Sequence, residues 1–120
     1  MITPAQVAEI AVKALDARLG KDIRLLKTEK VTVLANYFVI CTATTTTHIK
    51  TLADEVERLL TEAGEPPIRR EGYRQGGWVL LDFGCVIVHL FLQESREFYN
   101  LERLWGDAEE IDISFLLGPQ

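Results

Sequence analysis

The side chains in this sequence that could take part in nucleophilic or acid–base chemistry are few and widely spaced. The chain has two histidines, His48 and His89, and two cysteines, Cys41 and Cys85. A zinc site needs cysteine and histidine ligands at short paired spacings, which these residues do not have. A serine or cysteine nucleophile needs a flanking elbow motif, which is also missing. We therefore expect no metal, no cofactor and no catalytic residue, and we interpret both cysteines as reduced core thiols.

One segment has the pattern of a phosphate site. Residues 41–49 predict a strand end, a threonine-rich turn and a helix start, and the free amides of a helix start attract anions. The same hydroxyls also make an ordinary helix cap, and no glycine-rich cradle or Gly-Lys-Thr sequence accompanies them. Two-metal phosphoryl transfer would need several acids on adjacent strands, which offer only Asp82. A nucleotide-binding or nucleotidyltransferase-like enzyme is therefore the second hypothesis.

The strongest pattern is a predicted β-hairpin over residues 78–92. Two runs of β-branched, aromatic and aliphatic residues flank the turn sequence Asp82-Phe83-Gly84-Cys85. If Phe83 and Gly84 form the loop, cross-strand partners keep a constant sum of residue numbers. The expected pairs are Asp82 with Cys85, Leu80 with Ile87, and Trp78 with His89. A helix over residues 94–105 is expected to follow the hairpin directly.

This register separates the hairpin residues into two faces, provided that no bulge exchanges the faces on one strand. The aliphatic face, expected to pack beneath helices, consists of Val79, Leu81, Val86, Val88, Leu90 and Leu92. The mixed face consists of Trp78, Leu80, Asp82, Cys85, Ile87, His89 and Phe91. Two interpretations of the mixed face remain open. It is either a second buried side whose polar groups are hydrogen-bonded, or a partly open docking surface centred on Trp78.

The first half of the chain supplies elements that can support the hairpin. Thr3-Pro4-Ala5-Gln6 predicts a capped helix start, and Gly20 is expected to end this helix in the left-handed conformation. Residues 23–27 predict a short strand. Residues 35–42 predict a second strand that is buried on both faces and central in its sheet.

A second predicted helix follows the threonine turn and ends at Gly64. Its apolar stripe consists of Ile49, Leu52, Ala53, Val56, Leu59, Leu60 and Ala63. Residues 68–77 are glycine-rich and charged, so we expect a loop there, with or without one edge strand. Residues 111–115 alternate between apolar and polar types, which predicts a short terminal strand or a tail laid on the body.

The composition predicts one globular domain over residues 1–120, with residues 107–120 either part of it or a tail. Apolar residues make up 48% and charged residues 26%, which excludes a disordered chain. The net charge of −5 opposes direct nucleic-acid binding and suits a basic protein partner. The chain has no apolar run of roughly 20 residues and no N-terminal signal pattern, so we predict a cytoplasmic protein without a membrane segment.

Several segments, in order along the chain, match motifs of one known family. They are Ala35-Asn36-Tyr37-Phe38-Val39-Ile40, Ala53-Asp54-Glu55-Val56, Glu71-Gly72-Tyr73, Trp78-Val79-Leu80-Leu81-Asp82-Phe83-Gly84, Val88-His89-Leu90-Phe91 and Arg96-Glu97-Phe98-Tyr99-Asn100-Leu101-Glu102-Arg103-Leu104-Trp105. Over nearly its whole length the chain resembles the ribosomal silencing factor family, RsfS, also called Iojap. It departs from the family at Asn36, where Asp is common, and at residues 44–46, where a Gly-Thr-Ser-like loop is common.

The resemblance implies an α/β (α+β) fold, a single domain with a mixed β-sheet packed with helices, of nucleotidyltransferase-like shape but without enzymatic activity. It also implies a partner, large-subunit ribosomal protein fourteen, on the face of the large ribosomal subunit that meets the small subunit. Occupying that face would block subunit joining and lower translation when nutrients are limiting. When no ribosome is present, a homodimer that buries the same apolar face is a further hypothesis.

The resemblance and the hairpin pattern together predict five partner-binding residues. Trp78 is the expected anchor, and Leu80 and Tyr99 are its apolar surround. Asp82 and Glu102 are expected to accept hydrogen bonds from Arg or Lys of the partner. Two alternatives stay open, since Asp82 would instead pair with Arg96 if the two side chains were close, and Tyr99 would instead cover the core.

Overall fold

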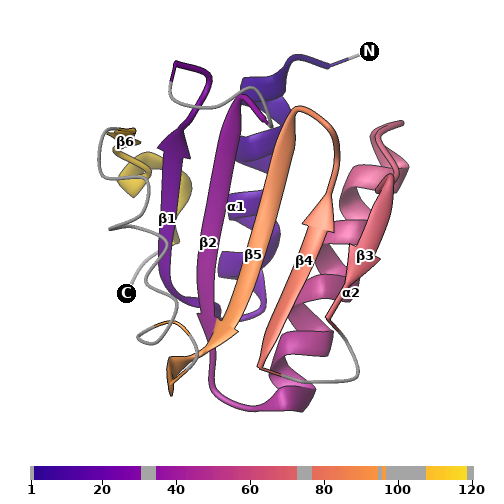
Figure 1. The fold of residues 1–120 in the computed structure, drawn as a ribbon, viewed down its shortest axis with the longest axis vertical. Helices are drawn as coiled ribbons and strands as arrows, with labels where there is room; N and C mark the ends of the chain where they lie inside the picture. Colours follow the sequence, from indigo (N-terminus) through magenta and orange to yellow (C-terminus); the bar gives the residue numbers. More distant parts are fainter. Residues whose placement is uncertain (1, 31–34, 73–76, 95, 97–107, 119–120) are drawn as a thin grey trace.

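In the part of the chain that the structure describes, two helices pack on one face of a mixed β-sheet (Figure 1). The computed structural model describes residues 2–30, 35–72, 77–94, 96 and 108–118. Within these residues the elements are α1 (Pro4–Ala17), β1 (Lys21–Lys27), β2 (Tyr37–Ala43), α2 (Thr46–Glu62), β3 (Arg69–Glu71), β4 (Trp78–Asp82), β5 (Val86–Leu92), β6 (Glu109–Ile111) and the 3₁₀ helix η1 (Ser114–Leu116). The expected fold class, a single α/β domain with a mixed sheet, is confirmed. The nucleotidyltransferase-like shape stays a prediction.

The sheet has the strand order β3-β4-β5-β2-β1-β6, so β5 and β2 lie at its centre. These two strands are parallel, and the other neighbouring strands are antiparallel. Every residue of β2 after Tyr37 is buried, as expected for a strand covered on both faces. The prediction of a central buried strand over residues 35–42 is therefore confirmed. The larger core lies between the sheet and both helices, and a smaller apolar cluster lies on the opposite face.

Helix α1 begins as its sequence predicts but ends differently. The Gln6 amide N–H donates to Thr3 Oγ1 at 3.2 Å, and the Thr3 N–H donates to Gln6 Oε1 at 2.8 Å, which completes a capping box. The prediction that Gly20 takes the left-handed conformation is wrong, because Leu19 takes it instead, with φ 63°. Gly20 is needed for space, since a Cβ atom there would lie 2.5 Å from the Cys41 sulfur.

Helix α2 is the element that the sequence predicts best. The Thr45 hydroxyl accepts from the His48 amide at 3.0 Å, and Gly64, with φ 89°, ends the segment as expected. Most of the predicted stripe is buried, although Leu59 is only partly buried. Among the described residues, no helix combines the length and apolar character needed to cross a membrane.

The two edges of the sheet are short strands. The loop expected over residues 68–77 contains one edge strand, β3, which pairs with β4. At the other edge, β6 pairs with β1, and the Gly118 amide donates to Asp16 Oδ2 at 2.8 Å. The described part of the tail therefore belongs to the body of the domain. The predicted alternation stops at η1, where Phe115 is 69% exposed.

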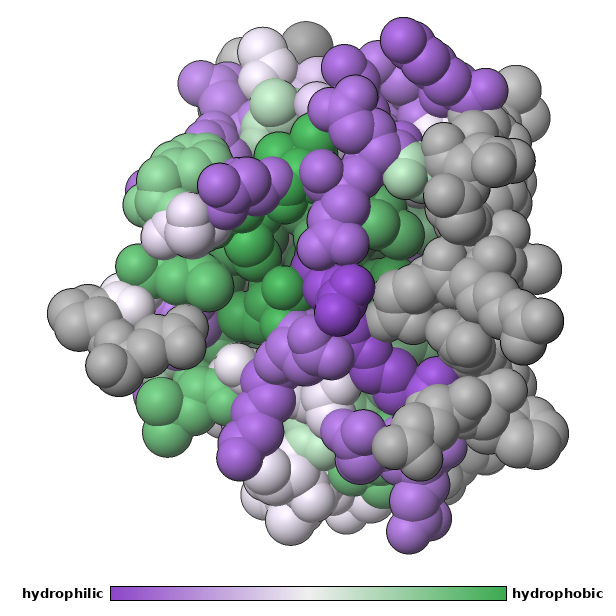
Figure 2. Space-filling model, turned by 90° about the vertical axis from the view of Figure 1, so that its left-hand side faces the viewer, coloured by the Kyte–Doolittle hydropathy of each residue, from purple (hydrophilic) through white to green (hydrophobic). Residues whose placement is uncertain are grey.

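Apolar side chains also reach the surface where β1, β6 and η1 meet α1 (Figure 2). The partly buried members of this surface are Ile10, Ile23, Ile111 and Leu117. These residues pack against the periphery of the larger core. This surface is separate from the mixed face of the hairpin, which belongs to the smaller cluster.

The two cysteines differ in environment. Cys41 is completely buried, and burial raises the pKa of its thiol to about 12, so it is an unreactive core residue as predicted. Cys85 is only partly buried, although burial raises its thiol pKa as well. Cys85 is a free thiol that packs against the larger core from the hairpin loop, so it lies at the edge of the core rather than inside it.

Candidate docking surface

The hairpin forms as predicted, but its predicted register is wrong by two residues. The observed pairs are Trp78 with Phe91, Leu80 with His89, and Asp82 with Ile87. The Phe83 amide donates to the Val86 carbonyl at 2.9 Å, so the loop consists of residues 84–85. Gly84 has φ 84° and takes the first loop position, where a tight hairpin favours glycine. The sequence prediction placed this glycine in the second position.

The predicted assignment of the hairpin strand residues to two faces is correct despite the wrong register. Side chains alternate with a period of two, so a shift of two residues leaves each strand residue on its expected face. The predicted aliphatic face contributes to the larger core beneath the helices. Of the mixed face, Trp78, Leu80, Ile87 and Phe91 belong to the smaller cluster on the opposite side of the sheet, whereas Cys85 packs against the larger core.

We call this opposite side of the sheet, with its cluster around Trp78, the Trp78 face. Strands β1, β2, β4 and β5 contribute to it. Its members in the smaller cluster are Leu26, Ala35, Phe38, Ile40, Trp78, Leu80, Ile87, Phe91 and Ala108. The contributions from β1 and β2 were not predicted, although a strand that is buried on both faces, as predicted for residues 35–42, must place every second side chain on this face. Trp78 and Leu80 are half-buried, so part of each side chain reaches the surface.

Four rings are packed together at the centre of the Trp78 face. Trp78 stacks on Phe91 with ring centroids 5.2 Å apart, and Phe38 meets His89 edge to face at 5.0 Å. The Trp78 indole N–H donates to His89 Nδ1 at 3.3 Å. His89 is 5% exposed, and burial lowers its pKa to about 4, so the ring is neutral near pH 7. His89 is therefore buried with a hydrogen-bonded ring, and Trp78 is partly accessible; docking at this face stays a prediction.

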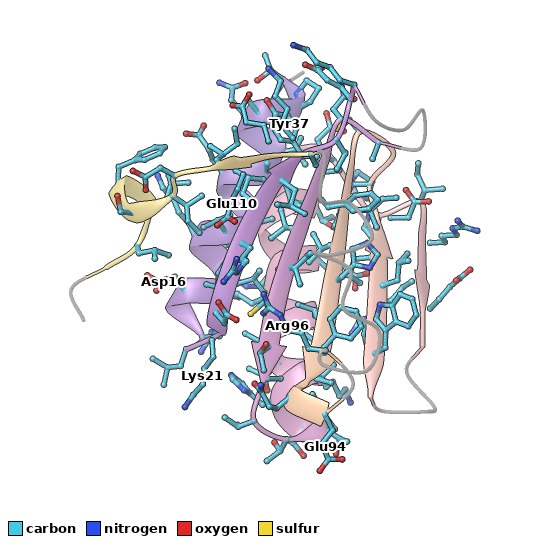
Figure 3. All side chains as sticks on the ribbon, turned by 60° about the vertical axis from the view of Figure 1, so that its left-hand side comes forward. Asp16, Lys21, Tyr37, Glu94, Arg96 and Glu110 are labelled. Atoms are coloured by element: carbon cyan, nitrogen blue, oxygen red, sulfur yellow. The ribbon has the colours of Figure 1, made fainter. Side chains whose placement is uncertain are left out.

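Asp82 is used mainly inside the protein. Its Oδ1 atom accepts from the Gly84 amide at 2.8 Å, and its Oδ2 atom pairs with Arg69 Nε at 3.1 Å. The alternative pairing with Arg96 is wrong, because Arg96 donates to Thr42 Oγ1 at 2.8 Å and to the Asp22 carbonyl at 2.6 Å. Figure 3 shows Arg96 toward the end of the sheet opposite the hairpin turn.

Charged residues border the apolar centre on both sides. On the β3–β4 side, Arg69 pairs with Asp82 and, at 3.4 Å, with Glu71. On the β1–β6 side, Arg24 pairs with Glu110 at 3.3 Å. The strand registers and the alternation of side chains place both pairs on the Trp78 face. An apolar, aromatic centre within a charged rim is the usual anatomy of a protein interface.

Two of the five predicted partner-binding residues are outside the described part of the chain. Tyr99 and Glu102 lie there, as does most of the predicted helix over residues 94–105, of which residues 94 and 96 have helical backbone. The structure brings together Trp78 and Leu80 in one cluster and places Asp82 at its edge. The roles of all five residues stay predictions.

The threonine turn makes a helix cap. The Thr44 amide donates to His48 Nδ1 at 2.9 Å, and His48 Nε2 lies 2.8 Å from the Arg18 carbonyl oxygen, to which it donates. The imidazole thus joins the end of α1 to the start of α2. Within the described residues, no three His, Cys, Asp or Glu side chains form a group suited to a metal ion. The amides of Thr44 and His48 are engaged in this cap, while phosphate binding at the turn stays a prediction.

A family model, named relatives and a solved structure all show similarity to this chain. The family described as "Ribosomal silencing factor during starvation" matches residues 2–119. A Chromobacterium violaceum protein named ribosomal silencing factor RsfS is 39% identical over 113 residues, covering 94% of this chain and 90% of that protein. A crystal structure of a protein from the same organism matches with TM-score 0.85 and 37% identity over 88% of each chain. The mouse protein named mitochondrial assembly of ribosomal large subunit protein 1 is 30% identical over 92% of this chain and 54% of its own.

Proposed function

The chain belongs to the ribosomal silencing factor family, and we propose that it binds large-subunit ribosomal protein fourteen through its Trp78 face. Bound there, it blocks joining of the small subunit and lowers translation when nutrients are limiting. The proposal needs no catalytic step, because its output is steric exclusion. The observation that carries it is the half-buried Trp78 at an aromatic centre between two charged rims.

The chemistry of this face suits a basic partner. Tryptophan among apolar neighbours is the residue type most often found at the energetic centre of an interface. The acids in the rim, Asp82, Glu71 and Glu110, can attract lysine and arginine side chains of the partner, and the net charge of −5 favours the encounter. Tyr99 and Glu102 are proposed to extend the same surface.

The name of the mouse relative supports the large subunit as the partner, since that protein is named for assembly of the large ribosomal subunit.

We also propose that two free copies associate through the Trp78 face when no ribosome is present. The dimer would then compete with ribosome binding. Addition of large subunits should dissociate it in analytical ultracentrifugation, and a dimer that persists on the ribosome would contradict the shared face.

Cosedimentation with separated ribosomal subunits tests the proposal. The wild-type protein should travel with large subunits, and Trp78→Ala should weaken this binding by about 30-fold, the equivalent of about 2 kcal/mol at an interface hot spot. Phe115→Ala is the matched control, because Phe115 is an aromatic residue that is 69% exposed on η1. A folded Trp78→Ala protein that binds as tightly as the control would remove the Trp78 face from the interface.

A further inference from the structure

We infer that His89 is a positioning residue for the docking surface, holding the Trp78 indole in the orientation that meets the partner. The inference rests on the proposed function and deepens it. It assigns the indole N–H to an internal hydrogen bond, which leaves the carbon atoms of the ring for recognition.

The geometry gives His89 a fixed acceptor. His89 lies on β5 opposite Leu80 of β4 and Ile40 of β2, so its backbone is paired on both sides. Its ring is held edge to face against Phe38 at 5.0 Å and parallel to Phe91 at 6.3 Å. Only 5% of the residue is exposed. The Nδ1 atom that accepts from Trp78 at 3.3 Å therefore has little freedom to move.

The hydrogen bond also fixes the tautomer of His89. A neutral imidazole that accepts at Nδ1 carries its proton on Nε2. The Nε2 atom is buried and has no hydrogen-bond partner among the described residues. A buried donor without a partner is unfavourable, and an apolar side chain of similar size would avoid that penalty. The imidazole is therefore useful at this position because its Nδ1 atom accepts the hydrogen bond from Trp78.

Among the described residues, His89 and Phe91 hold the indole through one polar and one apolar contact. The N–H is directed to His89, and the ring is stacked on Phe91 at 5.2 Å with an interplanar angle of 27°. Since the only polar atom of the Trp78 side chain is engaged within the protein, the partner meets ring carbons. Aliphatic groups and the cationic heads of lysine or arginine are the groups that such a ring recognises.

Two substitutions separate the acceptor from the ring. His89→Phe keeps an aromatic ring in the stack, with a six-membered ring in place of the imidazole, but removes the acceptor. His89→Asn loses the ring but places a carbonyl oxygen near the position of Nδ1. We expect His89→Phe to weaken large-subunit binding roughly fivefold, the equivalent of one ordinary hydrogen bond, and His89→Asn to stay within about twofold of wild type. The indole N–H resonance of Trp78 should move in His89→Phe and return toward its wild-type position in His89→Asn.

A double-mutant cycle tests whether His89 acts through the indole. Trp78→Phe lacks the N–H, so His89→Phe should cause no further loss of binding in that background. Equal losses from His89→Phe in both backgrounds would overturn the inference, as would equal losses from His89→Phe and His89→Asn. Circular dichroism and thermal unfolding establish that each variant is folded.

The outcomes also separate the inference from the proposed function. If Trp78→Ala weakens binding and a folded His89→Phe does not, the inference fails and the docking surface stands. If Trp78→Ala has no effect, the docking surface itself fails. If His89→Phe does not fold, the hydrogen bond can still be tested in the wild-type protein, because ¹⁵N NMR reports the tautomer of His89. A proton on Nδ1 would exclude the hydrogen bond, and a proton on Nε2 with a protected indole N–H would support it.

Discussion

Acidification is expected to destabilise this protein through His89. Burial lowers the pKa of His89 from 6.5 to about 4, because the charged imidazolium would lose its hydration in the smaller cluster. As the pH falls below 6.5, the unfolded chain therefore binds a proton that the folded protein does not. The stability that comes from the neutral ring is complete above pH 6.5, decreases as the pH falls, and is lost below about pH 4.

The size of the effect follows from the same two pKa values. The full difference corresponds to about 3 kcal/mol, at 1.36 kcal/mol for each pKa unit. At pH 5 the unfolded histidine is almost fully charged and the folded one is mostly neutral. The free energy of unfolding should then be lower than at pH 7 by about 2 kcal/mol from this residue alone.

Urea unfolding at pH 7 and pH 5 measures this change, with His89→Phe as the control. Phenylalanine keeps the ring packing and cannot be protonated, so all other titrating groups contribute equally to both proteins. The loss of stability between the two pH values should be smaller in His89→Phe by about 2 kcal/mol. An equal pH dependence in both proteins, or an NMR titration that places the pKa of His89 near 6.5, would refute the reasoning.

Three further predictions concern the larger core beneath the helices. Leu81→Ala should lower the free energy of unfolding by about 2–5 kcal/mol in urea titrations, because Leu81 is completely buried in the larger core; a loss below about 1 kcal/mol would show that the site collapses around the smaller residue. Gly20→Ala should destabilise the protein by about 1–3 kcal/mol, since its Cβ would lie 2.5 Å from the Cys41 sulfur. Gly64→Ala is its control in thermal unfolding, because open space surrounds Gly64 and only its φ of 89° opposes the change; a Gly20→Ala protein as stable as wild type would contradict the close approach. Iodoacetamide should modify the partly buried Cys85 before the fully buried Cys41, as followed by mass spectrometry of peptides, and equal rates would show that the core around Cys41 opens readily.

Local signals predicted most of the fold. The capping box at Thr3 and the uninterrupted stripe of α2 depend on residues three or four apart, so the sequence alone contains them. The faces of the hairpin were also predicted correctly, because alternation along a strand does not depend on its exact partners. The register was wrong because it depends on which loop position takes the positive φ of Gly84.

Contacts between distant segments could not be predicted in this way. Leu19 takes the left-handed position, and Gly20 is instead the residue that the Cys41 sulfur of β2 approaches, a contact that the local sequence does not contain. Arg69, the partner of Asp82, belongs to an edge strand that the sequence left open. The proximity of Trp78 and His89 was expected from an incorrect register, since the structure places Leu80 opposite His89 and Trp78 on the diagonal.

Subunit joining, followed by light scattering with purified small and large subunits, tests the central proposal most directly. The account predicts that the wild-type protein and Phe115→Ala suppress joining when they are added to large subunits first. Trp78→Ala, folded and at the same concentration, should leave joining close to its rate without the protein. Suppression by Trp78→Ala equal to that by the wild type, or undiminished joining on large subunits saturated with the wild type, would contradict it.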